Sequence, residues 1–276
     1  MNASSFPKRR AFAILSSIVL GSLPASAVVV VNTDFSADLP GMTFDGVNSG
    51  NTAGYGTGGP GDGSRAVHLI DTLSAAGGAN SAVTRFSTST AFSTANPGQS
   101  ELQISFDMAV TSLSSGLNSN AIPRILIRNT ADQTQGITFG FGVTAASNVI
   151  LFAAKGDSIA PANAGLSHNF GTYDTTTFTN NDTNGFVRIT LSLLHGGTTV
   201  NVSATQGATT LFSGDLTGFT SNSFSNTNLN FLGATGQSGT ASLYIDNLVI
   251  QTVPEPGAAV LAGLAPLALM LRRKRG

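Results

Sequence analysis

The chain has 276 residues and no cysteine, which excludes a disulfide-stapled domain, a lipoprotein anchor and a thiolate metal site. Seven of its thirteen basic residues lie at the two ends, three before residue 11 and four after residue 271, whereas thirteen of the fourteen acidic residues lie within 28–252, the exception being Glu255. Six basic against thirteen acidic residues give the interior a charge near −7, which argues against nucleic acid as a partner and favours cations or neutral glycans.

The first 27 residues have the layout of a secretory signal peptide. Lys8, Arg9 and Arg10 precede an apolar run over 11–20, and Ala25 and Ala27 form a small-x-small cleavage site. We therefore predict cleavage after Ala27. The Arg9-Arg10 pair partly fits a twin-arginine signal, but its flanking residues fit poorly, so the expected route is Sec export.

Residues 28–252 are dominated by a period of two, the repeat of a half-buried strand. The clearest example is 101–111, in which one face is apolar through Leu102, Ile104, Phe106, Met108 and Val110. The same alternation recurs at 137–143 and at 187–193, and the second run enters a hairpin that returns over 199–204. Weaker strands are expected at 28–31, 66–73, 82–86, 124–128, 148–153, 211–213 and 229–232, and a last strand at 243–250.

This pattern contains no amphipathic helix of ordinary length and no repeat of fixed period. It predicts an all-β fold, an antiparallel two-sheet β-sandwich over 28–252. The phrases Asn32-Thr33-Asp34-Phe35 and Tyr244–Ile250 resemble the opening and closing strands of jelly-roll carbohydrate-binding domains of the laminin-G or concanavalin-like kind. That resemblance implies a jelly roll.

The same resemblance implies a structural calcium ion. In calcium-bearing jelly rolls an acid of the closing strand and groups near the first strand hold the ion together, and the matching positions here are Asp246 and Asp34. The alternative is that Asp246 faces solvent or bonds a neighbouring turn. No other cofactor is implied.

The glycine-rich stretch 46–64 lacks an apolar pattern, so a flexible surface loop is expected, with Tyr55 as an incidental aromatic residue or a sugar platform. Catalytic signals are weak. Glu101 and Asp107 share a strand face but stand about 20 Å apart, too far for a glycosidase pair. His68, His168 and His195 have no metal spacing and no Gly-x-Ser-x-Gly elbow accompanies them, so no catalytic residue is predicted.

The last 24 residues, 253–276, carry three ordered features. The first is a stiff triplet, Pro254, Glu255 and Pro256. The second is 257–271, which is uncharged and is predicted to be a short transmembrane segment. The third is a basic cytoplasmic flank made of Arg272, Arg273, Lys274 and Arg275. This tail resembles the PEP-CTERM sorting signal of Gram-negative bacteria. The resemblance implies recognition by a membrane-embedded exosortase, removal of the tail, and delivery to the cell surface or an exopolysaccharide matrix.

Two classes of function follow. The first is an exported noncatalytic surface or extracellular-matrix protein that associates with exopolysaccharide, with the exosortase and the export machinery as its partners. The second is a secreted hydrolase or lyase that acts on polysaccharide, since sandwich folds host such sites. A plain spacer or structural coat is the third reading.

Overall fold

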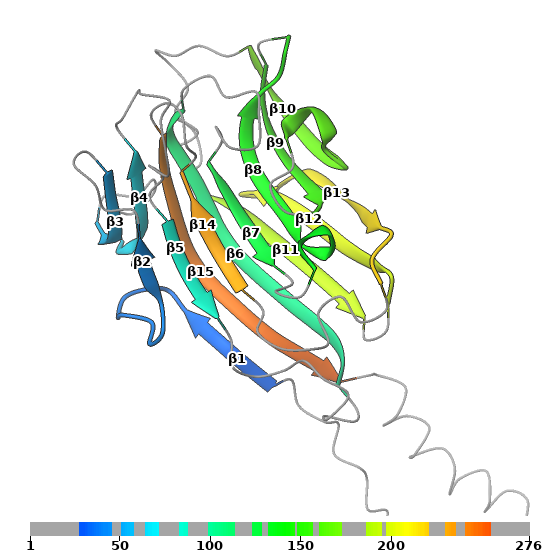
Figure 1. Ribbon diagram of the computed structural model, residues 1–276, viewed down its shortest axis with the longest axis horizontal. Coiled ribbons are helices and arrows are strands. Elements are labelled where there is room, and N and C mark those ends of the chain that lie inside the picture. The colour runs from blue at the N-terminus through cyan, green and yellow to red at the C-terminus, as the bar shows by residue number, and fades with distance from the viewer. Residues whose placement is uncertain are drawn as a thin grey trace, which may run out of the picture. The chain divides into compact units, whose positions relative to one another are not determined.

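A computed structural model describes residues 28–45, 51–57, 64–71, 83–87, 99–113, 123–128, 132–146, 148–156, 160–172, 186–194, 197–220, 230–235 and 241–254. All of them belong to one structural unit, Ser26–Glu255. They form two antiparallel β-sheets packed face to face (Figure 1), so the predicted all-β two-sheet sandwich is confirmed. The signal peptide (1–27) and the transmembrane segment (257–271) lie outside the described residues and stay predictions.

The first sheet, sheet A, has eight strands in the order β13-β12-β11-β6-β15-β4-β3, with β1 also paired to β15. Its strands are β1 (Val28–Thr33), β3 (Asn51–Gly56), β4 (Ala66–Asp71), β6 (Gln99–Leu113), β11 (Val187–Leu194), β12 (Thr199–Gln206), β13 (Thr209–Thr217) and β15 (Ala241–Pro254). The two longest strands, β6 and β15, run side by side through its middle (Figure 1).

The second sheet, sheet B, has seven strands in the order β10-β9-β8-β7-β14-β5-β2. They are β2 (Thr43–Asp45), β5 (Val83–Ser87), β7 (Arg124–Arg128), β8 (Ile137–Val143), β9 (Asn148–Lys155), β10 (Leu166–Thr172) and β14 (Asn230–Ala234), with short 3₁₀ helices η1 (Gln133–Gln135) and η2 (Pro161–Asn163) in the connections. Every strand pairing among the described residues is antiparallel.

The core lies where the apolar faces of the two sheets meet. Phe106 of β6 and Phe139 of β8 are both fully buried, and their rings meet edge to face with centroids 5.5 Å apart. The sheets approach closely at Gly233 of β14, where a Cβ would lie 2.5 Å from Ile245 Cδ1. The alternation read from the sequence therefore has its physical origin in this shared interior.

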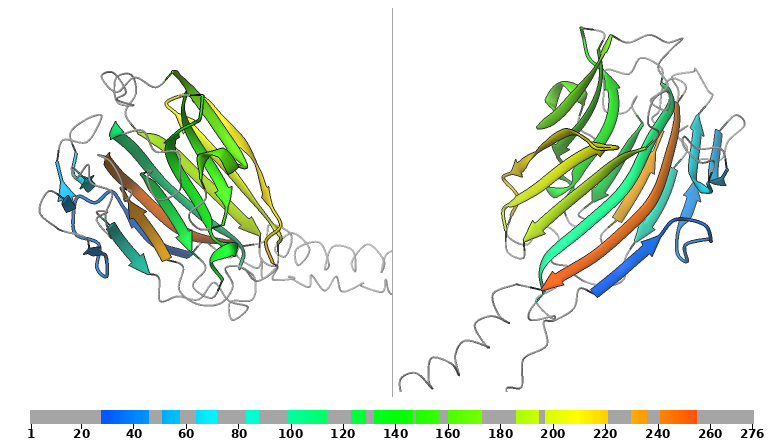
Figure 2. Two further views of the ribbon diagram at one scale, coloured as in Figure 1. Left: turned by 45° about the horizontal axis from the view of Figure 1, so that its top comes forward. Right: turned by 180° about the vertical axis from the view of Figure 1, so that it is seen from behind.

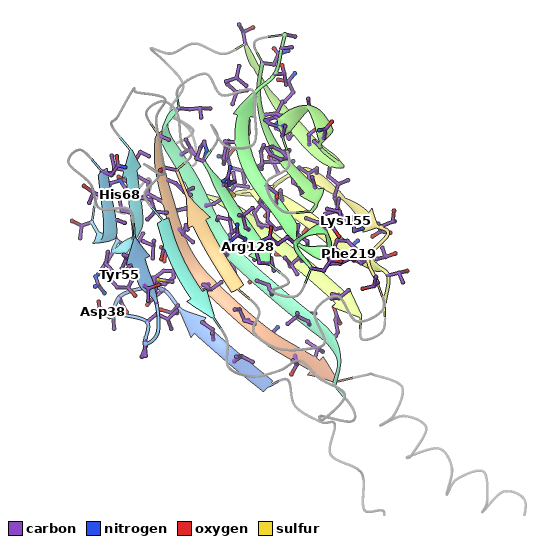
Figure 3. The ribbon with its side chains drawn as sticks, viewed as in Figure 1. Asp38, Tyr55, His68, Arg128, Lys155 and Phe219 are labelled. Carbon is purple, nitrogen blue, oxygen red and sulfur yellow. The ribbon has the colours of Figure 1, made fainter. Side chains whose placement is uncertain are left out.

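Side chains also join the two sheets along one edge. Lys155, at the end of β9, lies 5.5 Å from the ring centroid of Phe219, which follows β13 (Figure 3). Beside them the amide of Thr220 donates to Gln135 Oε1 at 2.8 Å. These contacts tie the end of β13 in sheet A to the β7–β9 region of sheet B.

Three strands were not expected from the sequence: β2, β3 and β10. The expected loop 46–64 is wrong in part, because residues 51–56 form β3 and pair with β4 from Asn51↔Asp71 to Gly56↔Ala66. Ala53 and Tyr55 of β3 pack against the core, so its apolar pattern is two residues long and is hidden among Gly and Thr. The glycine at 56 allows a close approach to β4, since a Cβ there would lie 3.3 Å from His68 Cβ.

The first and the last strand of the described chain pair in sheet A. Val28 of β1 pairs with Thr252 of β15, and Figure 2 shows the two strands side by side from behind. The strand β15 continues past the expected boundary at residue 252, since Val253 pairs with Glu101 and Pro254 with Gln99. The first proline of the triplet is therefore still part of the sheet.

Candidate functional site

The outer face of sheet A carries a row of charged residues across three strands. Arg188 of β11 pairs with Asp107 of β6, and Asp107 pairs with Asp246 of β15. Because residues such as Phe106 and Ile189, next to them in the chain, are buried in the core, the period of two turns Asp107 and Arg188 toward the outer face.

These residues form a hydrogen-bond network with one ion pair. Arg188 Nη1 donates to Asp107 Oδ1 at 3.1 Å and to the Asn247 carbonyl at 3.2 Å, and Nη2 donates to Ser105 Oγ at 2.8 Å. Asn247 Nδ2 donates to the other oxygen of Asp107, Oδ2, at 2.7 Å. Both Asp107 oxygens are thus engaged, and the guanidinium is held in a defined orientation.

Asn247 reaches this network because β15 is bulged at that point. The register with β6 shifts between Asp246 and Val249, and Asn247 has a left-handed φ of 50°. Asparagine tolerates that conformation better than most residues with a Cβ. The backbone amide of Asn247 donates to Asp246 Oδ1 at 2.7 Å, so the Asp246 side chain stabilises the bulge that follows it.

The segment that follows β1 forms a wall beside this network. Phe35 has a φ of 55° and a fully buried ring, and its amide donates to Thr33 Oγ1 at 2.9 Å. The amide of Ser36 donates to Asp34 Oδ1 at 3.0 Å. The chain therefore turns sharply, with Phe35 inserted into the core and Asp34 left on the surface.

Tyr55 and Arg65 fasten the far end of this wall. The Leu39 amide donates to the Tyr55 hydroxyl at 2.8 Å, and Arg65 Nη1 donates to the Phe35 carbonyl at 3.0 Å. The Arg65 guanidinium lies 4.2 Å from the Tyr55 ring centroid and is ion-paired with Asp38. Tyr55 and Asp38 lie near one another in Figure 3. Tyr55 is therefore neither incidental nor a free sugar platform: it supports the wall.

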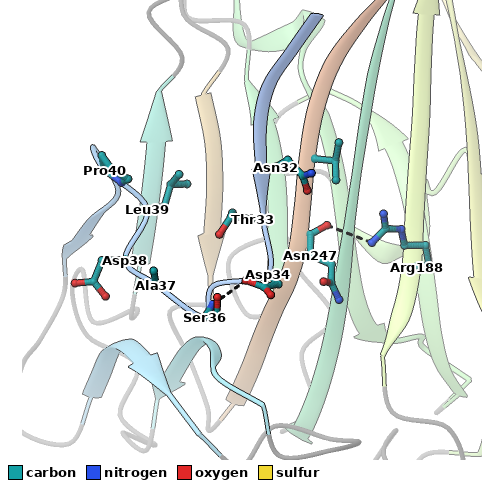
Figure 4. Close-up of a pocket in the computed structure, with 11 residues that line it drawn as sticks. Asn32, Thr33, Asp34, Ser36, Ala37, Asp38, Leu39, Pro40, Arg188 and Asn247 are labelled. Atoms are coloured by element: carbon teal, nitrogen blue, oxygen red, sulfur yellow. Dashed lines mark hydrogen bonds between the residues drawn. The ribbon is translucent and has the colours of Figure 1, made fainter. Parts of the chain in front are cut away.

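Between the wall and the network lies a pocket of 650 Å³ (Figure 4). It is lined by Asn32, Thr33, Asp34, Ser36, Ala37, Asp38, Leu39, Pro40, Arg188, Asn247 and Val249. Hydrogen bonds from the Ser36 side chain and amide lower the pKa of Asp34, so its carboxylate is charged at neutral pH. The lining thus offers amide, hydroxyl, carboxylate and guanidinium groups beside the apolar side chains of Ala37, Leu39, Pro40 and Val249.

The structure brings the two predicted calcium residues to the same part of sheet A. Thr33 pairs with Leu248, so Asp34 follows β1 close to the bulge that begins at Asp246. Asp34 is exposed and Asp246 is buried, and each accepts a backbone hydrogen bond from a residue nearby in the chain. Among the described residues, no group of three or more His, Asp and Glu side chains is arranged to hold a metal. Calcium at Asp34 and Asp246 stays a prediction.

The other candidate residues have structural partners. Glu101 accepts hydrogen bonds from Gln103 Nε2 at 3.0 Å and from Ser192 Oγ. His68 stacks on Tyr244 with centroids 3.9 Å apart, its Nε2 lies 3.0 Å from Ser242 Oγ, and burial lowers its pKa. His168 meets Phe170 edge to face.

Several predicted residues are outside the described part of the chain. His195, the cleavage-site residues Ala25 and Ala27, and the sorting residues Glu255, Pro256, Arg272, Arg273, Lys274 and Arg275 are among them, whereas Pro254 ends β15. No helix in the described ranges has the length and apolar character that a membrane crossing requires.

Sequence reasoning missed the residues that build the pocket. Arg188 and Asn247 lie on strands that were expected, but nothing in their spacing pairs them with Asp107. The available signal was a basic residue on the polar face of an alternating strand, and an asparagine within the closing strand. Both are common, and the pairing depends on strand order.

Comparison of the sequence with protein-family models and with curated proteins finds no match. Solved structures do resemble the fold. A carbohydrate esterase from the Shiga toxin-encoding bacteriophage phi24B matches with a TM-score of 0.50 at 14% identity, over 83% of this chain and 100% of that one. A lectin from Bauhinia forficata in complex with GalNAc has a TM-score of 0.48 at 10% identity, over 83% and 99%. The alginate lyase Aly36B has a TM-score of 0.43 at 13% identity, over 83% and 98%.

At these identities the likeness to the esterase shows the fold alone. It agrees with the two antiparallel sheets described above. The role of the pocket has to be argued from its own residues.

Proposed function

We infer that the protein is an exported, noncatalytic surface or extracellular-matrix protein of a Gram-negative cell envelope, whose sandwich associates with exopolysaccharide through the pocket on sheet A. Its tail, from the Pro254 triplet to Arg275, is the sorting signal for an exosortase-type system. The membrane contact lasts only until that tail is removed.

The pocket carries the binding part of this proposal. A glycan presents hydroxyl groups that both donate and accept hydrogen bonds, and the lining supplies both kinds of partner through Asn32, Ser36 and Asn247. Its 650 Å³ lies within the ~300–1,000 Å³ usual for small-ligand pockets. The walls are held by hydrogen bonds before any ligand arrives, which lowers the entropic cost of binding.

The hydrogen bonds made by Asp107 and Glu101 support a noncatalytic role for these two carboxylates. Asp107 is bonded to Arg188 and Asn247, and Glu101 to Gln103 and Ser192. Acid–base catalysis on a glycosidic bond requires a carboxyl group that exchanges protons with the substrate. The alternative, a hydrolase or lyase on this scaffold, predicts turnover that falls when one pocket carboxylate is changed.

Export and sorting are tested by the intact mass and location of the protein in its own cells. We expect a chain that begins at Val28 and ends at Pro254 or within the next few residues, because β15 holds Pro254 in the sheet. The mass should be found outside the cell. A membrane-bound mass that retains Arg272 to Arg275 would mean a plain tail anchor and would remove the sorting proposal.

Glycan association is tested with the exported protein and a panel of neutral polysaccharides. Asn32→Ala removes an exposed pocket amide, and Asn201→Ala removes an exposed amide of β12 that bonds Asp215 away from the pocket. We expect Asn32→Ala alone to weaken retention, with no shortening of the polymer. Equal retention of both variants would contradict the pocket, and shortened polymer would favour the enzyme.

A further inference from the structure

The charges at the pocket are unequally compensated. Three charged side chains line it: Asp34, Asp38 and Arg188. Arg188 and Asp38 each have an oppositely charged partner, Asp107 and Arg65 respectively. The net charge of the pocket therefore depends on whether Asp34 also has a charged partner.

Arg188 is a poor candidate for a second anion. Its Nη1 and Nη2 atoms already donate to Asp107, Ser105 and the Asn247 carbonyl, and its side chain is 38% exposed. The adjacent Asp107 carboxylate cancels its charge at short range. An incoming carboxylate would therefore compete with Asp107, the cross-strand neighbour of Arg188 on β6.

Asp38 is neutralised in the same way on the other side. Arg65 pairs with it, and Arg65 is itself held over the Tyr55 ring and against the Phe35 carbonyl. The position of that cation is set by the wall. The Arg65 guanidinium therefore compensates the charge of Asp38 and not that of Asp34.

Asp34 has only neutral partners among the described residues. Its carboxylate accepts hydrogen bonds from Ser36, whose amide lies 3.0 Å from Oδ1, and the residue is exposed at the pocket. Figure 4 shows Asp34 and Ser36 bonded on the wall, apart from Arg188. The pocket therefore has one uncompensated negative charge, on a domain that is itself acidic.

We propose that this pocket selects glycans that carry a free ammonium group, such as hexosamine units without their N-acetyl group, over neutral and uronic-acid glycans. This rests on the proposed glycan association and names its ligand class. The ammonium would pair with Asp34, and the sugar hydroxyls would bond to Asn32 and Asn247. A uronate would meet Asp34 and the acidic surface of the domain and would be repelled.

The test is a titration of the exported protein with three sets of oligosaccharides of equal length: glucosamine, N-acetylglucosamine and galacturonate oligomers. The variant Asp34→Asn removes the charge, and its amide oxygen can still accept the Ser36 bond. Asp215→Asn, on β13, is the matched control because it removes an exposed carboxylate that accepts a hydrogen bond from Asn201, away from the pocket. Thermal melting checks that all variants are folded.

We expect the parent and Asp215→Asn to bind the glucosamine oligomers most tightly. Asp34→Asn should bind them about twofold to fivefold more weakly, the effect of one exposed ion pair. The preference should shrink between about 0.05 M and about 0.5 M salt, because exposed charges are screened. Asp34→Lys should shift the preference toward galacturonate.

The outcomes separate the two proposals. Binding of all three oligomers with equal strength, or unchanged binding by Asp34→Asn, would overturn the ammonium preference and leave glycan association standing. Tighter binding of galacturonate by the parent would also overturn the ammonium preference. It would mean that Arg188, and not Asp34, selects the ligand. Failure of every oligomer and polysaccharide to bind would overturn the glycan association itself.

Discussion

The outer faces of the two sheets differ sharply. On sheet A the outer face is polar around Arg188, Asp107 and Asn247, and it borders a pocket. On sheet B the outer face of β9 is apolar and buried: Phe152 is fully buried and clusters with Ile150 and Ala154. Ala164, which follows η2, packs against that cluster.

The difference shows that a buried second face leaves little surface for a ligand. Strands β8 and β9 are buried along nearly their whole length, and even Thr138 is buried, with its hydroxyl donating to the Gly156 carbonyl at 2.7 Å. Sheet A has one face packed into the core, and its other face borders the pocket. Three charged side chains, Asp34, Asp38 and Arg188, line the pocket on sheet A.

The difference between the two faces can be tested by removing one phenylalanine from the core and one from the outer face of sheet B. Phe106→Ala opens the core between the sheets, and Phe152→Ala opens the outer face of sheet B; both rings are fully buried. Each change should lower the free energy of unfolding by about 3–5 kcal/mol, measured by urea denaturation. Gln251→Ala, on the outer face of sheet A, should change it by no more than about 0.5–1 kcal/mol.

A loss at Phe152 as small as that at Gln251 would show that the outer face of sheet B is not packed. The comparison between the two faces would then fail. A small loss at Phe106 would mean that the apolar faces were assigned to the wrong side of β6.

A smaller effect is expected from the ion pair on sheet A. Arg188→Ala removes three hydrogen bonds and should cost about 1–2 kcal/mol. In a double-mutant cycle with Asp107→Asn the coupling should be about 1 kcal/mol, since Arg188 is 38% and Asp107 15% exposed. The cycle of Asn201→Ala with Asp215→Asn, an exposed pair on the same sheet, should give a coupling near zero. Equal couplings would contradict a built network.

The smallest effect concerns pH. Burial lowers the pKa of His68 below its usual value of 6.5, so the unfolded chain binds the proton more readily than the folded one. The stability that this histidine contributes is present above pH 6.5 and is lost as the pH falls through its lower folded pKa. His68→Gln should flatten the fall in urea midpoint between pH about 7.5 and about 5. An unchanged slope would assign the fall to other groups.

Much of the fold followed from the alternation of apolar residues. The bounds Arg124–Arg128 and Ile137–Val143 agree with prediction, and β6 and β11 differ by a residue or two at their ends. In β6, β8 and β11 apolar residues recur at every second position because one face of each strand is core, whereas β7 is a run of three apolar residues between two arginines. The strand β3 was missed because only Ala53 and Tyr55 of its residues pack against the core, and two of its six residues are glycines, of which Gly56 lies against His68.

The alternation in the sequence was enough to predict the sandwich and the polar face of each clear strand, and two short motifs predict the terminal segments on which the export proposal depends. Those features are local: they are read within one strand or one short motif. The shared pocket of Asp34, Arg188 and Asn247 became visible in the tertiary structure alone, because the order of β1, β15, β6 and β11 brings these residues together. Strand order is set by packing across the whole domain, so no spacing in the chain encodes that meeting.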